Sequence, residues 1–411
     1  MRKCVLALTV VIVVLFTASC GGGAPAASNG EAPELLRAVP SDALSVGVFS
    51  RLEKGLPEMV DSNSVLFNLD YGKLSRARAA VALCNVGSLA PLLVIEAGKA
   101  GADTLDAAAA VIAAADSLKI SSALVTLQSR NALLLSPSAT VITVCGRHLA
   151  AETSILDAPD FGGVVDALTG SDAIIYRNSG ASKLLDSGLC SVARKDLAAF
   201  LKDACEWTVV SREKVSCVQP VSEKYFCNFL SSIEEAPSKL AAFYPSGAEF
   251  IADLPVASVA GFRKSYEAWR DARVELEQYR KAIGALSRKT GKDPLAWEKE
   301  LGVKEVVYVA APGYRINMLR VSKQQTSEGV TANPYTGFVS ALYGGLYNAA
   351  DSCVIRTGNW IISGERSVLD TLSFGAVKPE AWPAKTKAVA DMPGRRINYA
   401  KDNITIWHSN R

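Results

Sequence analysis

The feature that most constrains the fold is an order of apolar segments that occurs twice along the chain. A Pro-Ser turn followed by an apolar run opens residues 39–49 and again residues 244–254. Apolar and β-branched runs broken by Gly or Pro then predict one β-hairpin over 77–99 and another over 303–323. We therefore predict an α+β fold of two similar modules, each an antiparallel sheet with helices. The alternative is that hairpins and helices alternate in any α+β chain.

Each of these hairpins is followed by a segment that we expect to be helical. In the first half the helix opens at Asp103 and continues through an alanine-rich stretch. In the second half Asn333 is the expected N-cap and Pro334 the first helical residue, which is a favoured pair. Two apolar strands should follow each helix, with Asn131 and Asn359 between them.

The two modules differ in one place, because a long amphipathic helix is predicted only in the second. Over residues 257–289 apolar side chains recur every three or four positions on an otherwise charged helix. The simpler interpretation is that this stripe packs on its own sheet. The alternative is that it docks a partner helix or a second copy of the protein, with Tyr266, Trp269 and Tyr279 as candidate partner-binding residues.

These patterns divide the chain into four parts. Residues 1–19 are predicted to be a signal peptide and residues 20–34 a flexible tether, because Gly, Ala, Pro and Ser dominate the tether and cannot form a core. Residues 35–237 should form the first module and residues 238–411 the second.

The N-terminal residues are predicted to direct the chain to the cell envelope. Arg2 and Lys3 precede an apolar run, 5–16, that is shorter than the about 20 residues a membrane-spanning helix needs. Small residues and Cys20 follow directly, an order that resembles the lipobox of bacterial lipoproteins. In that motif the cysteine thiol receives a diacylglycerol and the chain is cut just before it. Thr17 stands where Leu is usual, so an ordinary signal or an uncleaved anchor is the alternative.

The lipobox, the opening Pro-Ser segments and the stretch 291–309 together resemble a group of poorly characterised bacterial envelope lipoproteins with duplicated α+β modules. The resemblance implies lipidation at Cys20 and a membrane anchor in the cell envelope or periplasm, on a face that the sequence leaves open, and it offers no catalytic residues. Gly21 is not the acidic residue that commonly retains lipoproteins at the inner membrane, so we expect the outer membrane.

The cysteines predict free thiols more readily than a bonded framework. Cys84, Cys145 and Cys353 lie in strand-like apolar runs, where cysteine behaves as a small buried apolar residue. A second group is closer together, and one disulfide among its members, of undetermined pairing, stays an alternative in an oxidising envelope. A zinc site is disfavoured because no Cys-x-x-Cys pair occurs. The group consists of Cys190, Cys205, Cys217 and Cys227.

Motifs for catalysis are scarce. His148 and His408 are the two histidines, each expected at a turn or strand end, and the near-neutral charge of +3 argues against binding of nucleic acid. Ser211 and Lys214 have the Ser-x-x-Lys spacing of penicillin-binding enzymes, but they lie in a predicted hairpin rather than on a helix. We therefore predict no enzyme, cofactor or metal. The leading hypothesis is a non-enzymatic interaction or structural role with an envelope partner or through self-association. The alternatives are a ligand-binding lipoprotein with a cleft between the modules and an unrecognised hydrolase.

Overall fold

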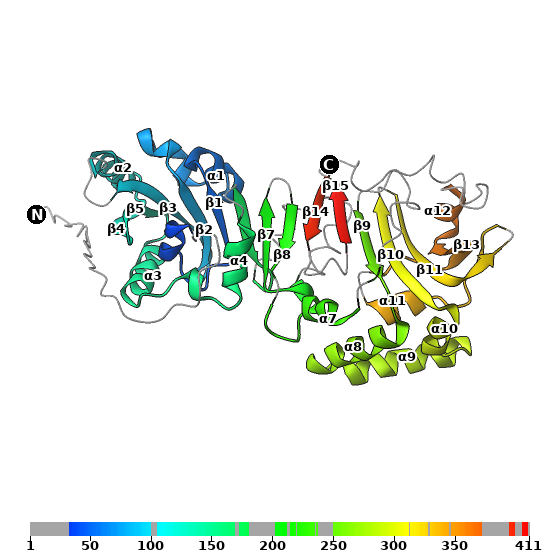
Figure 1. The fold of residues 1–411 in the computed structure, drawn as a ribbon. Coiled ribbons are helices and arrows are strands. Elements are labelled where there is room, and N and C mark those ends of the chain that lie inside the picture. Colours follow the sequence, from blue (N-terminus) through cyan, green and yellow to red (C-terminus); the bar gives the residue numbers. More distant parts are fainter. Residues whose placement is uncertain are drawn as a thin grey trace, which may run out of the picture. The chain divides into compact units, whose positions relative to one another are not determined.

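A computed structural model gives the fold as two compact units (Figure 1). The structure describes residues 33–99, 105–168, 172–180, 202–211, 214–218, 220–234, 236, 250–311, 313–327, 329–344, 347–371, 394–398 and 405–409.

The boundary between the units differs from the predicted one. The first unit extends to Arg177 and includes 209–211, while 178–208 and 212–411 belong to the second. The strand that ends at Arg177 pairs with the first strand of the chain and so completes the first sheet. The segment expected to finish the first module instead packs against the second, because Phe226 and Phe229 contact aromatic residues of that unit.

The first unit is an antiparallel sheet with strand order β6-β1-β2-β3-β5-β4. Leu92 and Leu93 are both fully buried although neighbouring strand residues point to opposite faces, so both faces of this sheet are covered. The strands are β1 (Ser45–Phe49), β2 (Ala79–Asn85), β3 (Leu89–Lys99), β4 (Ser121–Thr126), β5 (Arg130–Ser136) and β6 (Ala173–Arg177). The helices are η1 (Glu34–Ala38), α1 (Leu52–Met59), η2 (Val65–Asn68), η3 (Gly72–Arg76), α2 (Leu105–Ser117), α3 (Ala139–Ala150), η4 (Ile155–Asp157) and α4 (Phe161–Ala167).

The second unit has strand order β12-β13-β11-β10-β9-β15-β14-β8, with β14 and β8 parallel and the other described pairs antiparallel. The strands are β8 (Lys214–Cys217), β9 (Phe250–Pro255), β10 (Val303–Ala311), β11 (Tyr314–Thr326), β12 (Thr331–Ala332), β13 (Cys353–Gly364), β14 (Gly394–Asn398) and β15 (Thr405–Ser409), and β7 (Trp207–Ser211) is divided between the units. The helices are α7 (Phe226–Ser232), α8 (Val259–Ala272), α9 (Leu276–Thr290), α10 (Pro294–Leu301), α11 (Phe338–Tyr343) and α12 (Arg366–Thr371).

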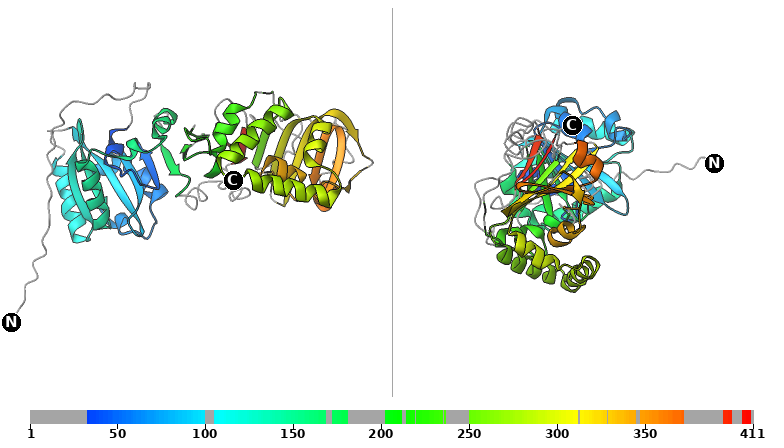
Figure 2. Two further views of the ribbon diagram at one scale, coloured as in Figure 1. Left: turned by 90° about the horizontal axis from the view of Figure 1, so that it is seen from below. Right: turned by 90° about the vertical axis from the view of Figure 1, so that its right-hand side faces the viewer.

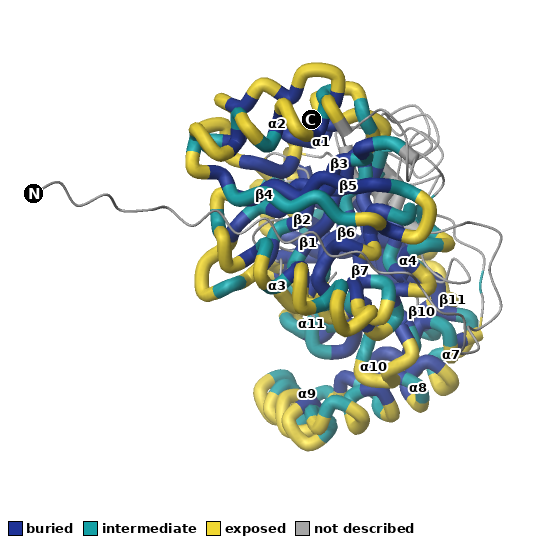
Figure 3. The backbone as a smooth tube through the Cα atoms, turned by 90° about the vertical axis from the view of Figure 1, so that its left-hand side faces the viewer, coloured by how far each residue is buried: buried dark blue, intermediate teal, exposed yellow. Residues whose placement is uncertain are grey.

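Helices cover both faces of the second sheet (Figures 1 and 2). On β13, Ile362 packs with Leu369 of α12 in one apolar cluster. Its neighbour Ile361 faces the other side, where α10 and α11 lie. In Figure 3, α8 and α9 expose their outer sides and bury their inner sides, which is the amphipathic arrangement that the sequence predicts.

The α+β class is confirmed. The two predicted hairpins are present as β2–β3 and β10–β11. The order β1-β2-β3-β5-β4 also has a counterpart in β9-β10-β11-β13-β12, with every adjacent pair antiparallel. This is a correspondence of strand order only, and duplication of the modules stays a prediction.

The prediction of a single long helix over 257–289 is wrong, because the chain turns between α8 and α9. Val274 has a left-handed backbone with φ +62°, and the Glu275 amide donates to the Arg270 carbonyl. Both Arg270 and Arg273 form ion pairs with the Glu275 carboxylate at 2.6 and 2.9 Å, which stabilises the turn. The apolar spacing conceals the break because each helix is amphipathic by itself.

Four local predictions are also corrected. Asn131 lies inside β5, and the turn precedes it. Asn359 lies inside β13, where the register with β11 shifts between Arg320 and Gln325, so the Gly-Asn pair marks an irregularity in the strand pairing rather than a turn. Asn333 caps only a turn, since α11 begins at Phe338. Cys145 lies on helix α3 rather than on a strand. The prediction missed the helix because the β-branched residues around Cys145 conceal the helical spacing of the buried positions.

Candidate functional site

The three candidate partner-binding aromatics belong to the interior of the second unit. Tyr266 is fully buried, and Trp269 and Tyr279 are 8% and 6% exposed. The ring centroids of Tyr266 and Tyr279 lie 5.5 Å apart, and the Trp269 ring lies 5.0 Å from that of Phe226 on α7. The Trp269 indole N–H also donates to the carbonyl of Lys224. These side chains hold α7, α8 and α9 together, so the predicted contact with a partner does not fit them.

A buried ion pair lies beside this aromatic core. Arg263 of α8 and Glu298 of α10 approach to 2.8 Å, and the Glu298 side chain is completely buried. The Tyr343 hydroxyl donates to the same carboxylate, while the Arg263 guanidinium donates to the carbonyl of Leu342 at 2.5 Å. Burial opposes the charge of the guanidinium, but the Glu298 carboxylate overcomes this and raises the pKa of Arg263. The pair therefore fixes α8 and α10 relative to α11.

A small pocket lies between α10, α11 and the sheet of the second unit. Its volume is about 150 Å³. Trp297 provides an aromatic wall, with ring centroids 5.8 Å from Tyr335 and 5.4 Å from Phe338. The lining residues are Lys292, Trp297, Glu300, Leu301, Leu319, Asn333, Tyr335, Val339, Val354, Arg356, Ile361 and Ser363.

Two of the three charged residues that line the pocket are paired with each other, and the third is not. Lys292 and Glu300 form an ion pair with each other at 2.5 Å. Arg356 of β13 is half-buried, and its guanidinium forms no ion pair with any acidic residue that the structure describes. The pocket therefore offers an aromatic wall and one guanidinium to an incoming group.

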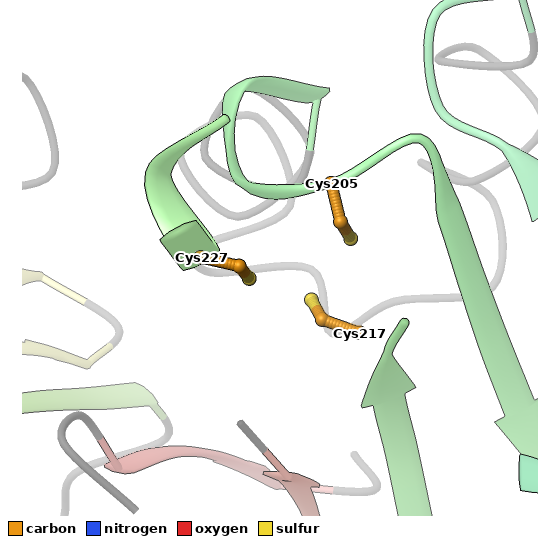
Figure 4. Close-up of side chains that lie close together, drawn as sticks. All are labelled: Cys205, Cys217 and Cys227. Atoms are coloured by element: carbon orange, nitrogen blue, oxygen red, sulfur yellow. The ribbon is translucent and has the colours of Figure 1, made fainter. Parts of the chain in front are cut away.

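Three cysteines that are apart in the sequence converge in the second unit. Cys205 precedes β7, Cys217 ends β8 and Cys227 lies in the first turn of α7. Their sulfur atoms all lie within 4.8 Å of one another, and Figure 4 shows the three side chains pointing toward a common centre. Cys205 and Cys227 are buried, while Cys217 as a residue is partly exposed although its thiol lies among buried groups.

Hydrogen bonds differentiate these three thiols. The Asn178 amide donates to the carbonyl of Cys205 at 2.8 Å and lies 3.4 Å from its sulfur, and the Thr208 hydroxyl lies 3.9 Å from that sulfur. Burial raises the pKa of Cys205, but hydrogen bonds from Cys217, Cys227 and Thr208 outweigh it and lower the pKa. Burial, together with the neighbouring sulfurs, raises the pKa of Cys217, and the hydrogen bond with Cys205 raises the pKa of Cys227.

Where the structure describes their side chains, the remaining candidate residues do not form a further site. Cys20 and Cys190 lie outside the described residues. The Nδ1 atom of His148 is 2.9 Å from the Thr153 hydroxyl at an exposed helix end. His408 lies on β15, at the position that pairs with Phe250 of β9.

The Ser-x-x-Lys spacing falls on strands, as expected, since Ser211 ends β7 and Lys214 begins β8. For the three cysteines, the short spacings in the sequence indicate that they lie near one another, but the sequence contains no metal-ligand motif. The pocket has no sequence signal, because its lining comes from α10, β11, α11, β13 and two connecting segments.

Comparison of the chain with family models, with curated proteins and with solved structures found no match. The resemblance to duplicated envelope lipoproteins therefore stays a prediction. No helix in the described part of the chain combines the length and the apolar character needed to cross a membrane.

Proposed function

We propose that this protein is a lipid-anchored, non-enzymatic protein of the bacterial cell envelope that binds a partner protein through the pocket of the second unit. The size of that pocket supports the proposal. Sites for small molecules commonly measure about 300–1,000 Å³, whereas this pocket measures about 150 Å³. A cavity of about 150 Å³ accepts a group of the size of benzene. Such a volume suits one anchoring side chain of a partner.

The chemistry of the lining defines the anchoring side chain. Trp297 and Tyr335 offer ring faces to an apolar stem, and Arg356 offers a fork of donors to a carboxylate. Glu300 does not compete for Arg356, because it is paired with Lys292. We expect an acidic residue of the partner to enter with its carboxylate at Arg356, which is the kind of buried anchor that dominates interface energies.

The proposed membrane anchor is a lipid attached to Cys20. A diacylglycerol on that thiol and the tether of residues 20–34 would hold both units at the membrane, since two acyl chains give stable attachment. Replacement of the cysteine, Cys20→Ser, should release the protein from membranes or leave it as precursor. The control is Cys4→Ser, which precedes the apolar run and should leave anchoring unchanged. If mature Cys20→Ser protein stays with the membrane, lipidation at this residue is wrong.

The partner proposal is tested by gentle extraction of the tagged full chain from native membranes and mass spectrometry of the proteins that co-purify. A stoichiometric partner should be lost from Arg356→Glu and weakened by Tyr335→Ala. The control is Arg366→Glu, which reverses an exposed charge of the same unit at the start of α12. A partner that is retained by Arg356→Glu, or the absence of any stoichiometric partner, contradicts the proposal.

A further inference from the structure

We propose that Cys205, Cys217 and Cys227 bind one thiophilic metal ion, of which Zn²⁺ is the representative. Their sulfurs lie within 4.8 Å of one another. A zinc–sulfur bond of about 2.3 Å in tetrahedral geometry separates two sulfurs by about 3.8 Å. The thiols therefore need to move by only about 1 Å to coordinate one ion, which side-chain rotation alone supplies.

The position of the ligands gives the metal a structural role. Cys205 and Cys217 flank the β7–β8 segment, and Cys227 belongs to α7, which contacts α8 through Phe226 and Trp269. One ion would thus connect a strand pair to the helical layer, beside the hydrogen bond that the Tyr225 hydroxyl donates to Glu206. No fourth carboxylate, imidazole or thiol joins the group among the described residues, so water would complete the coordination.

A metal accounts for the cluster better than a disulfide does. A disulfide uses two sulfurs and leaves the third without a role, whereas all three here are mutually close. Binding is balanced without an oxidant: three thiols release three protons as Zn²⁺ forms three Zn–S bonds. The complex carries one negative charge. The Asn178 amide at 3.4 Å from the Cys205 sulfur is the kind of neighbouring donor that orients and stabilises thiolate ligands.

Cys217 is the least buried of the three as a residue, whereas Cys205 and Cys227 are buried. The sequence contains no Cys-x-x-Cys pair because the three ligands come from separate segments, one before β7, one at the end of β8 and one in α7. Spacing rules detect sites that are built on one turn and not sites like this one, which the fold assembles.

The test uses the full chain, reduced and freed of metal with a chelator, and Zn²⁺ alone as the probe. Competition with a chromophoric chelator should show one Zn²⁺ per chain. Loss of a neighbouring donor weakens metal sites by about 10–100-fold, so loss of a ligand in Cys217→Ser or Cys227→Ser should weaken binding by more than about 100-fold. The matched control is Cys353→Ser, which removes a buried thiol of the same unit outside the cluster and should bind as the parent does.

A second measurement covers the case in which the serine variants do not fold. In the parent chain, Zn²⁺ should protect Cys205, Cys217 and Cys227 from alkylation, as read by peptide mass spectrometry, and leave Cys353 unaffected. The proposal is overturned if the folded, reduced chain binds no Zn²⁺, if protection falls on other cysteines, or if protein taken from the envelope carries a disulfide between two of the three.

Discussion

The buried ion pair between Arg263 and Glu298 allows a quantitative prediction. The Glu298 side chain is fully buried and that of Arg263 is 11% exposed, so neither charge is screened well by water. Removing one partner of such a pair costs about 3–5 kcal/mol, because the remaining charge stays buried without compensation. We therefore expect Glu298→Ala to lower the free energy of unfolding of the second unit by about 4 kcal/mol. The Tyr343 hydroxyl also loses its acceptor, which acts in the same direction.

Two variants separate charge from packing. Glu298→Gln keeps an oxygen for one donor and loses the charge, so it should cost about 2 kcal/mol, the value of a charged hydrogen bond. The double variant Arg263→Met with Glu298→Leu removes both charges and should recover much of the loss, since apolar replacement of a buried pair is often neutral. Glu267→Ala is the control, because it breaks a largely exposed pair with Arg280 and should cost less than about 1 kcal/mol.

The assay is urea unfolding followed by tryptophan fluorescence. All six tryptophans lie after residue 178, so the signal reports the second unit selectively. The reasoning is refuted if Glu298→Ala costs less than about 1 kcal/mol, or if the double variant is no more stable than Glu298→Ala, because each result would mean that the remaining charge finds water.

Three further predictions concern single positions. Val274→Gly should stabilise the second unit by about 0.5–1 kcal/mol in urea unfolding, since a left-handed Val is strained and 93% exposed, and a loss of stability would contradict this. Gly55→Ala should destabilise the first unit by about 1–3 kcal/mol, as measured by circular dichroism, because a Cβ there would lie 2.2 Å from the Phe49 ring. Gly284→Ala in α9 is the control, since its Cβ meets no such contact, and it should stabilise the second unit by about 1 kcal/mol. The pKa of Glu275 is lowered because Arg270 and Arg273 outweigh its burial. The contribution of Glu275 to the free energy of unfolding is therefore present above its ordinary pKa of 4.5 and disappears as pH falls through its pKa in the folded protein. The difference in unfolding free energy between the parent and Glu275→Gln should therefore shrink in acid, and a difference independent of pH would refute it.

Local patterns predicted the elements that are determined locally. The hairpins over 77–99 and 303–323 are present because their apolar and β-branched runs and short turns specify them without distant contacts. The break at Val274 was missed because nothing in its own residue type favours a left-handed backbone. Ion pairs of Glu275 with Arg270 and Arg273, which precede it by five and two residues, hold the turn there.

The sites depended on distant contacts and were correspondingly harder to predict. The aromatic stripe with Tyr266 was correctly placed on a helical face, but spacing does not distinguish a face that meets a partner from one that meets α7. The cluster of Cys205, Cys217 and Cys227 needed the β7–β8 segment and α7 to be folded before three spaced cysteines became neighbours.

The position of the β14–β15 hairpin in the second sheet has a consequence for the order of folding. β14 pairs with β8 and β15 pairs with β9, so this hairpin separates two strands that occur much earlier in the chain. The strands β1 to β6 of the first sheet are all synthesised once the chain has reached Arg177, whereas β8 and β9 must wait for β14 and β15, which follow every other described strand. Until then both present open edges to the surroundings, which is the state in which strands recruit neighbours from other chains. The second sheet is therefore completed later in synthesis than the first, and its edges stay open for longer.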